Sequence, residues 1–227
     1  MNDRAYNQDM IETDGRRLKG DASRRLVLDR AVDLASVEGL DGLSIGRLAT
    51  AANVSKSGVA TLFGTKERLQ LATVEAASQR FREAVMFPAR VEPRGIRRIA
   101  LLLDLWIAYS RDRVFPGGCF FAAAAADLDA KPGPVHDAVA QAFDSWGDYV
   151  RVSLGYAIEA SELAADTDAA QLSFEITALL DGSNTRSLLA GSNEPYVRAR
   201  RALVSRLLGA GAEPVAIRVL SEGDDGA

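Results

Sequence analysis

A short predicted helix at residues 56–63 has the residue types and spacing of a surface that contacts DNA. Its small or polar side consists of Lys56, Ser57, Gly58 and Thr61. Val59 and Phe63 are four residues apart, so they share the opposite, inward side. Small side chains let a helix backbone approach base edges closely, and Lys56 is the strong donor on this side for guanine O6 and N7. If this helix is the second of a helix-turn-helix, this is the face that would enter the major groove of double-stranded DNA.

Two further predicted helices position this surface. The apolar spacing predicts one helix over residues 27–35 and another over residues 45–52, with Ser44 as the cap of the second. Asn53 fits the turn that follows, because asparagine tolerates a left-handed backbone, and Ser55 caps the third helix. Two helices joined by so short a turn are the layout of a helix-turn-helix. The same pattern also fits an ordinary helical hairpin inside a bundle.

A resemblance supports the first reading. The stretch LDGLSIGRLATAANVSKSGVATLFGTKERL resembles the DNA-binding domain of the tetracycline-repressor (TetR) family of transcriptional regulators. The motifs that carry it are Leu-Ser-Ile, then Ala-Asn-Val-Ser-Lys at the turn, then Phe-Gly-Thr-Lys-Glu entering the next helix. The close resemblance spans about residues 23–76. The later segment Phe-Pro-Gly-Gly-Cys-Phe-Phe resembles a C-terminal domain subtype of the same family.

The resemblance implies a set of DNA contacts, with phosphates at helix starts and base edges or the adjoining backbone along the third helix. The implied residues are Ser44, Arg47, Ser55, Lys56, Ser57, Gly58, Thr61 and Lys66. Ala60 stands where the family commonly has an aromatic residue, and Leu62 where histidine is frequent. Both departures remove hydrogen-bonding capacity. We expect compensation from a basic arm that contains Arg16, Arg17, Lys19, Arg24 and Arg25.

Charge is unevenly distributed along the 227 residues, whose formal net charge is −4. Residues 16–70 carry ten Lys and Arg against six Asp and Glu, whereas the chain before and after this segment is acidic. A polyanion that binds this protein should therefore meet its N-terminal third. A basic segment of this size is equally consistent with an ordinary solvated face.

The whole chain reads as all-α, with about nine helices and no confident strand. We expect a mobile arm over residues 1–20 and a helix-turn-helix DNA-binding domain over residues 21–66. An effector-binding and dimerisation domain should follow over residues 67–209, and a mobile tail over residues 210–227.

Aromatic residues on the C-terminal helices are the best candidates for lining a ligand pocket, since such pockets are mainly apolar. The candidates are Trp106, Tyr109, Phe120, Phe121, Trp146 and Tyr149. Each of them could equally fill the core. As a set they predict an apolar or aromatic effector, and the family resemblance implies a C-terminal domain that binds a small effector and dimerises.

The last two long helices are the expected homodimer interface. The predicted interface residues are Leu172, Ile176, Leu179, Ser183, Arg201, Val204 and Leu208. Two copies would pack as a four-helix bundle with two-fold symmetry, which suits a palindromic operator. These helices could instead only complete the protomer's core.

Other classes of function find little support in the sequence. One cysteine, Cys119, and one histidine, His136, cannot form a closed metal site, and no catalytic arrangement is identifiable, so we expect no cofactor and no enzyme. No apolar run is long enough to span a membrane, which favours a cytoplasmic protein. We predict a ligand-responsive DNA-binding regulator, most simply a repressor released from its operator by an effector. The alternatives are an all-α enzyme and a helical adaptor without DNA binding.

Overall fold

The computed structural model describes the backbone of residues 3–222 and the side-chain surroundings of residues 20–222. The described α-helices are α1 (Asp3–Glu38), α2 (Ile45–Ala51), α3 (Lys56–Phe63), α4 (Lys66–Phe81), α5 (Ile96–Arg111), α6 (Phe120–Leu128), α7 (Pro134–Glu159), α8 (Ala169–Ala190), α9 (Glu194–Gly209) and α10 (Arg218–Glu222). A π-helical turn at Arg82–Met86 continues α4, and 3₁₀ turns lie at Pro88–Val91 and Pro214–Ile217. Within the described chain the only β-type pairing is an isolated bridge between Phe115 and Gly118. The all-α prediction is confirmed.

Local capping fixes where the helices of the N-terminal region begin. Ser44, Ser55 and Thr65 each precede a helix, and each side chain accepts a hydrogen bond from the backbone N–H three residues on. Such caps satisfy N–H groups that a helix leaves unpaired at its start, and each contributes about 1 kcal/mol. The predicted boundaries of α2 and α3 therefore agree closely with the observed ones.

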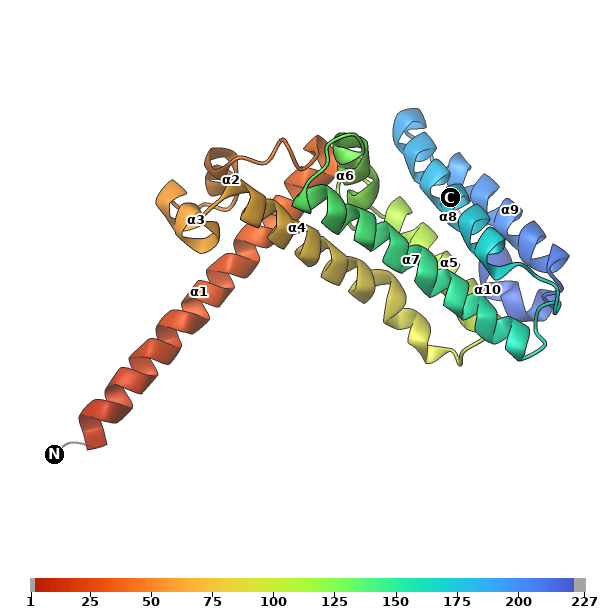
Figure 1. Cartoon of the computed structure of the whole chain (residues 1–227), viewed down its shortest axis with the longest axis horizontal. Coiled ribbons are helices and arrows are strands. Elements are labelled where there is room, and N and C mark those ends of the chain that lie inside the picture. The colour runs from red at the N-terminus through yellow and green to blue at the C-terminus, as the bar shows by residue number, and fades with distance from the viewer. Residues whose placement is uncertain (1–2, 223–227) are drawn as a thin grey trace.

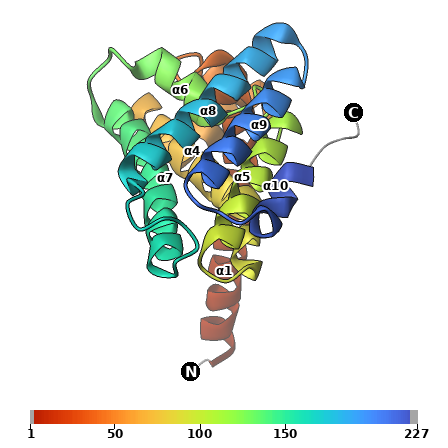
Figure 2. The same ribbon diagram turned by 90° about the vertical axis from the view of Figure 1, so that its right-hand side faces the viewer.

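The helices form two groups (Figure 1). The head consists of α2, α3 and the part of α1 that packs against them, while α5 to α10 form the body and α4 runs from the head into it. In Figure 2, α8 and α9 lie side by side on the outer face of the body. One continuous apolar core extends from Val27 in α1 to Leu220 in α10.

The N-terminal arm is helical in the structure. Residues 3–20 continue α1 without a break, and this half of the helix projects away from the remaining helices (Figure 1). We predicted a helix over residues 27–35, but α1 begins far before residue 27, so Asp21 and Ser23 lie inside the helix.

The expected mobile tail over residues 210–227 is also corrected for the part that the structure describes. Ile217 and Leu220 are buried, and the Arg200 guanidinium donates to the Leu220 carbonyl oxygen at 2.9 Å. The same guanidinium lies 2.6 Å from the Asp104 carboxylate, which explains a charged residue within the apolar α5. The hydrogen bond from Arg200 and apolar burial hold α10 against α9 and α5, and the ion pair joins α9 to α5. Residues 223–227 lie outside the described part.

Candidate nucleic-acid interface and ligand cavity

The solvent-facing side of α3 carries the residues predicted to read DNA. Lys56, Ser57, Ala60 and Thr61 are exposed, and Gly58 beside them is half-buried. Val59 and Phe63 are buried in the head, as their spacing predicts. The surface of α3 is thus formed by small side chains and one long cation.

The turn before α3 is closely packed around Ser55. Asn53 has a φ of 53°, the left-handed conformation expected of it. The Ser55 hydroxyl accepts from the Gly58 N–H at 3.0 Å and lies 3.1 Å from the Ser57 hydroxyl. A Cβ at residue 58 would lie 3.1 Å from the Ser55 oxygen, which is closer than ordinary contact. Glycine at this position therefore serves the cap as well as any close approach to a ligand.

Two cations predicted to contact DNA are engaged within the protein. Arg47 on α2 forms a two-pronged ion pair with Glu38 at the end of α1. Lys66, the first residue of α4, donates to the Asp41 carbonyl oxygen at 2.9 Å. Both cations remain more than half exposed. Exposed pairs of this kind contribute only about 0–1 kcal/mol, so a phosphate can compete for either cation.

Arg24 and Arg25 of the basic arm differ in their surroundings. Arg24 donates to the Leu62 carbonyl oxygen at 3.0 Å, and its guanidinium lies 4.6 Å from the centre of the Phe63 ring. Arg24 therefore fixes the end of α3 to α1, and Arg25 is exposed. The side chains of Arg16, Arg17 and Lys19 lie outside the described surroundings.

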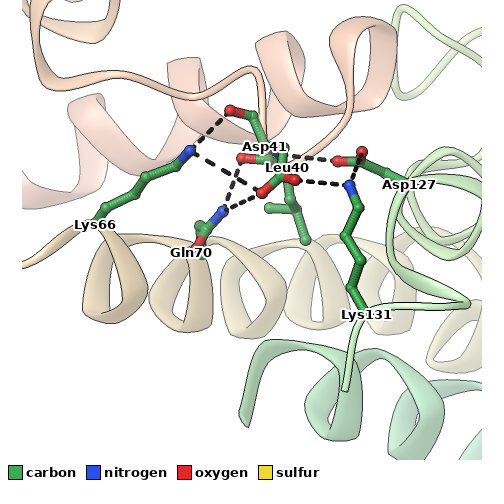
Figure 3. A network of polar contacts seen from close by, with 6 residues as sticks. All are labelled: Leu40, Asp41, Lys66, Gln70, Asp127 and Lys131. Atoms are coloured by element: carbon green, nitrogen blue, oxygen red, sulfur yellow. Dashed lines mark hydrogen bonds and ion pairs between the residues drawn. The ribbon is translucent and has the colours of Figure 1, made fainter. Parts of the chain in front are cut away.

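A polar network joins the head to the body (Figure 3). Asp41, in the loop before α2, pairs with Lys131 of the α6–α7 loop at 2.7 Å, and its N–H donates to the Asp127 carboxylate at 2.8 Å. The hydrogen bond from Lys131 holds the pKa of Asp41 below its ordinary value. On the α4 side, Gln70 donates to the Leu40 carbonyl oxygen at 3.0 Å. The loop that leads into α2 is therefore held by residues of α4, α6 and the α6–α7 loop.

A second contact between head and body involves the loop before α6. The Gly117 N–H donates to the Ser36 hydroxyl of α1 at 3.0 Å. A Cβ at residue 117 would lie 1.8 Å from the Ser36 carbonyl oxygen, so no other residue type fits without movement. The neighbouring Gly118 has a φ of 88°, and a Cβ there would lie 2.5 Å from the Asn184 side chain of α8. The loop is thus packed between α1 and α8.

A cavity of about 360 Å³ opens among α4, α5, α6, α7 and α8. Its walls are mainly apolar and aromatic, and its volume is within the range of small-molecule sites. The lining residues are Leu71, Val74, Glu75, Ser78, Phe81, Arg82, Met86, Trp106, Cys119, Phe121, Ala138, Gln141, Ala142, Phe143, Ser145, Trp146 and Asp181.

Three of the six predicted pocket aromatics line this cavity: Trp106, Phe121 and Trp146. Tyr109 and Phe120 are instead buried outside the lining. Tyr149 lines a separate surface depression of about 450 Å³ with Arg90, Arg94 and Arg98.

Phe81 is the main aromatic that the sequence reading missed. Its ring packs edge-on against Tyr109, Phe121 and Trp146, with centroids 5.3, 6.0 and 5.2 Å away. The spacing of Val74 and Phe81, seven residues apart on one side of α4, was the signal for it.

Comparison with known families agrees with both parts of the structure. Residues 27–73 match the family described as "Bacterial regulatory proteins, tetR family". Residues 95–203 match the description "Tetracyclin repressor-like, C-terminal domain". The chain belongs to the TetR family of transcriptional regulators. No curated protein matches the sequence significantly.

Solved structures with the same fold come from several bacteria. A TetR transcriptional regulator from Chloroflexus aurantiacus superposes with a TM-score of 0.78 at 24% identity, covering 84% of this chain and 96% of that one. A TetR-family regulator from Cytophaga hutchinsonii gives 0.76 at 20% identity, covering 86% and 98%. AibR, solved in complex with isovaleryl coenzyme A and operator DNA, gives 0.59 at 15% identity, covering 72% and 86%.

The predicted dimer residues of this TetR-family regulator fall into two groups. Leu172, Ile176 and Ser183 are buried inside the protomer, which corrects our prediction that they meet a second copy. Arg201 and Leu208 are exposed on α9, and Leu179 and Val204 are half-buried. The α8 residues that do face solvent include Phe174, exposed by 67%, and Leu189, exposed by 84%. The exposed apolar side chains of α8 therefore lie on a different side of the helix from the three buried residues.

Three titratable groups of the regulator lie near one another, and two of them, Cys119 and Asp181, line the cavity. Burial raises the pKa of the Cys119 thiol and raises that of the Tyr109 phenol well above its ordinary value. Burial also raises the pKa of Asp181 to about 6. A thiol that is buried and neutral is a poor nucleophile, so Cys119 has the surroundings of a packing residue.

Two further properties concern the described chain as a whole. No group of acidic, histidine and cysteine residues within it is arranged to hold a metal ion. None of its helices combines the length and the apolar character that a membrane crossing requires.

Proposed function

We propose that this chain is a ligand-responsive repressor that binds a palindromic operator through α3 and leaves it when an effector fills the cavity. The observation that carries the proposal is that one chain has both an exposed face on α3 and an aromatic cavity whose wall includes α4. We call the α3 face, formed by Lys56, Ser57, Gly58 and Thr61, the reading face. In this scheme α4 connects the two sites, because it starts in the head and its middle lines the cavity. The structure of AibR, solved in complex with isovaleryl coenzyme A and operator DNA, supports the presence of both a ligand site and an operator site on this fold.

On DNA, Lys56 and Thr61 would meet base edges, and Ser57 and Gly58 would meet the adjoining backbone. Ser44 and Ser55 would add phosphate contacts at helix starts, although both hydroxyls also cap their own helices. Arg47 and Lys66 would exchange Glu38 and Asp41 for phosphates. The site of action is the cytoplasm, where the DNA is.

A homodimer would place two α3 helices about one DNA turn, roughly 34 Å, apart. We assign the interface to the outer face of α8 and α9 (Figure 2), where other helices of the chain leave apolar side chains uncovered. The proposed contacts are Phe174, Ala178, Leu179, Leu189, Arg201, Val204 and Leu208. Exposed apolar surface of this kind marks an interaction site in a soluble protein.

Lys56→Ala tests the reading face. We expect it to weaken binding to a DNA fragment from upstream of the protein's own gene, measured by fluorescence anisotropy, and to weaken binding to random DNA less. The loss on the specific site should be about 1–3 kcal/mol, the usual contribution of one strong base contact. Arg97→Ala is the matched control, because it removes an exposed cation from α5 in the body.

Equal weakening on both DNAs would reduce Lys56 to a phosphate contact. A salt titration of the unmodified protein separates the regulator from the alternatives. A regulator should show a steep dependence of affinity on salt and one preferred site. An enzyme or a helical adaptor should show neither.

A further inference from the structure

The cavity contains a carboxylate without a partner. Asp181 of α8 is half-buried and lines the cavity wall. Among the described residues, no hydrogen-bond donor or cation pairs with its side chain, and only its backbone oxygen accepts, from Thr185. Charged groups that are partly shielded from water are favoured by a partner of opposite charge, so a carboxylate that lines an apolar cavity is suited to a cationic ligand.

The one cationic residue that lines the cavity, within the described part of the chain, is already engaged. Arg82 also lines the cavity, but its guanidinium lies 2.9 Å from the Glu75 carboxylate and donates to Gln79 as well. These two charges, which belong to α4 and its π turn, neutralise each other. Asp181 is therefore the one uncompensated charge among the residues that line the cavity.

The remaining walls suit a positive charge. Five aromatic rings line the same space: Phe81, Trp106, Phe121, Phe143 and Trp146. An aromatic face attracts a cation, tryptophan most strongly, and the attraction grows when water is excluded. A carboxylate and aromatic walls together form a site for an ammonium group attached to an apolar or aromatic body.

We propose that the effector of this regulator is an apolar or aromatic cation and that Asp181 is its counter-ion in the cavity. This proposal rests on the proposed function, since it specifies the chemistry of the same effector site. It also predicts that the cavity distinguishes ligands of the same shape by their charge. The carboxylate would repel an anionic ligand, and a neutral ligand would leave the carboxylate unpaired.

The titration of Asp181 gives the proposal a pH signature. Burial raises its pKa to about 6, so the carboxylate is mostly ionised at neutral pH. The other titratable groups that face this region are Tyr109 from α5, Cys119 before α6, and the Glu75–Arg82 pair. Tyr109 and Cys119 stay neutral at pH 7 because their pKa values are raised. Affinity for a permanent cation should therefore fall as the pH drops through 6.

The chain carries its own probe of the cavity, because both of its tryptophans line it. We would titrate the full-length protein with 4-phenylbutylamine, 4-phenylbutan-1-ol and 4-phenylbutanoate. Tryptophan fluorescence would be followed with excitation at a wavelength that tyrosine and the phenyl probes do not absorb. The three probes share one apolar body and differ in charge. We expect the amine to bind at least tenfold more tightly than the alcohol, and the carboxylate to bind most weakly.

Asp181→Asn should abolish the preference for the amine and leave the affinity for the alcohol within about twofold. Asp144→Asn is the matched control, because it removes an exposed carboxylate from α7 that does not line the cavity. This control should keep the preference. Thermal melting and size-exclusion chromatography of each variant would exclude misfolding or altered assembly as the cause.

Several outcomes would overturn the proposal. Equal affinity for the three probes, tighter binding of the carboxylate, the absence of any response to the amine, or a preserved amine preference in Asp181→Asn would each reject the counter-ion. An Asp181→Asn variant that changes the dimer and not the ligand would assign the carboxylate to the subunit interface. Operator binding measured in the same samples separates these failures from failure of the proposed function.

Discussion

Gly117→Ala should force the loop before α6 away from the end of α1. The added Cβ would lie 1.8 Å from the Ser36 carbonyl oxygen and 2.4 Å from its carbon. Ordinary contact begins at 3.4 Å, so the two backbone segments must separate by about 1.6 Å. Gly117 is not among the glycines with positive φ, so alanine suits the local backbone and the conflict is steric alone.

The expected loss of stability follows from two terms. Overpacking by one methyl group in a close backbone contact typically costs 1–3 kcal/mol. The hydrogen bond from the Gly117 N–H to Ser36, now 3.0 Å long, would also lengthen. We expect a net loss of roughly 2 kcal/mol, which lowers the melting temperature by about 4–8 °C for a chain of this size. Operator affinity should fall too, because α1 carries the head.

Thermal melts at one fixed protein concentration, together with operator titrations, would measure both effects. Gly155→Ala is the control, since a Cβ at that helical position of α7 would meet nothing within 4 Å. Alanine there should stabilise the protein by up to about 1 kcal/mol. If Gly117→Ala has the same melting temperature and the same operator affinity as the unmodified protein, the idea that this contact sets the position of the head is refuted.

Three other substitutions test separate parts of the structure. Arg200→Ala leaves the Asp104 carboxylate without its partner and should lower the free energy of unfolding in urea by about 3–5 kcal/mol; a loss under 1 kcal/mol would contradict the pairing. Leu189→Glu should convert a dimer to monomers in analytical ultracentrifugation, whereas Val215→Glu, at another exposed apolar position, should not. Ser55→Ala removes the cap of α3 and should cost about 1 kcal/mol; an unchanged urea midpoint would show that Ser57 substitutes for it.

The head was predictable in detail because its signals are local. A capping side chain lies three residues from the N–H that it binds, so Ser44, Ser55 and Thr65 fix their helix starts within a few residues of sequence. Asn53 likewise marks its turn through its own backbone preference. The inward direction of Val59 and Phe63 follows from helical spacing.

The body was less predictable because its decisive contacts join residues far apart in the chain. The partner of Asp104 is Arg200, and nothing near either residue indicates the other. The apolar spacing on α8 identified a buried face correctly but could not say whether another part of the chain or a second copy covers it. Asp181 gave no signal at all, since a lone acidic residue in a helix normally faces water.

The π turn at Arg82–Met86 places one surplus residue where α4 meets the rest of the body. A π turn holds more residues per turn than the 3.6 of an α-helix, and both Arg82 and Met86 face the cavity from it. Deleting one residue here would restore regular α-helix but rotate one side of the junction by about 100° relative to the other. This single extra residue therefore determines in which direction the residues after the π turn face, relative to the α4 residues that line the cavity.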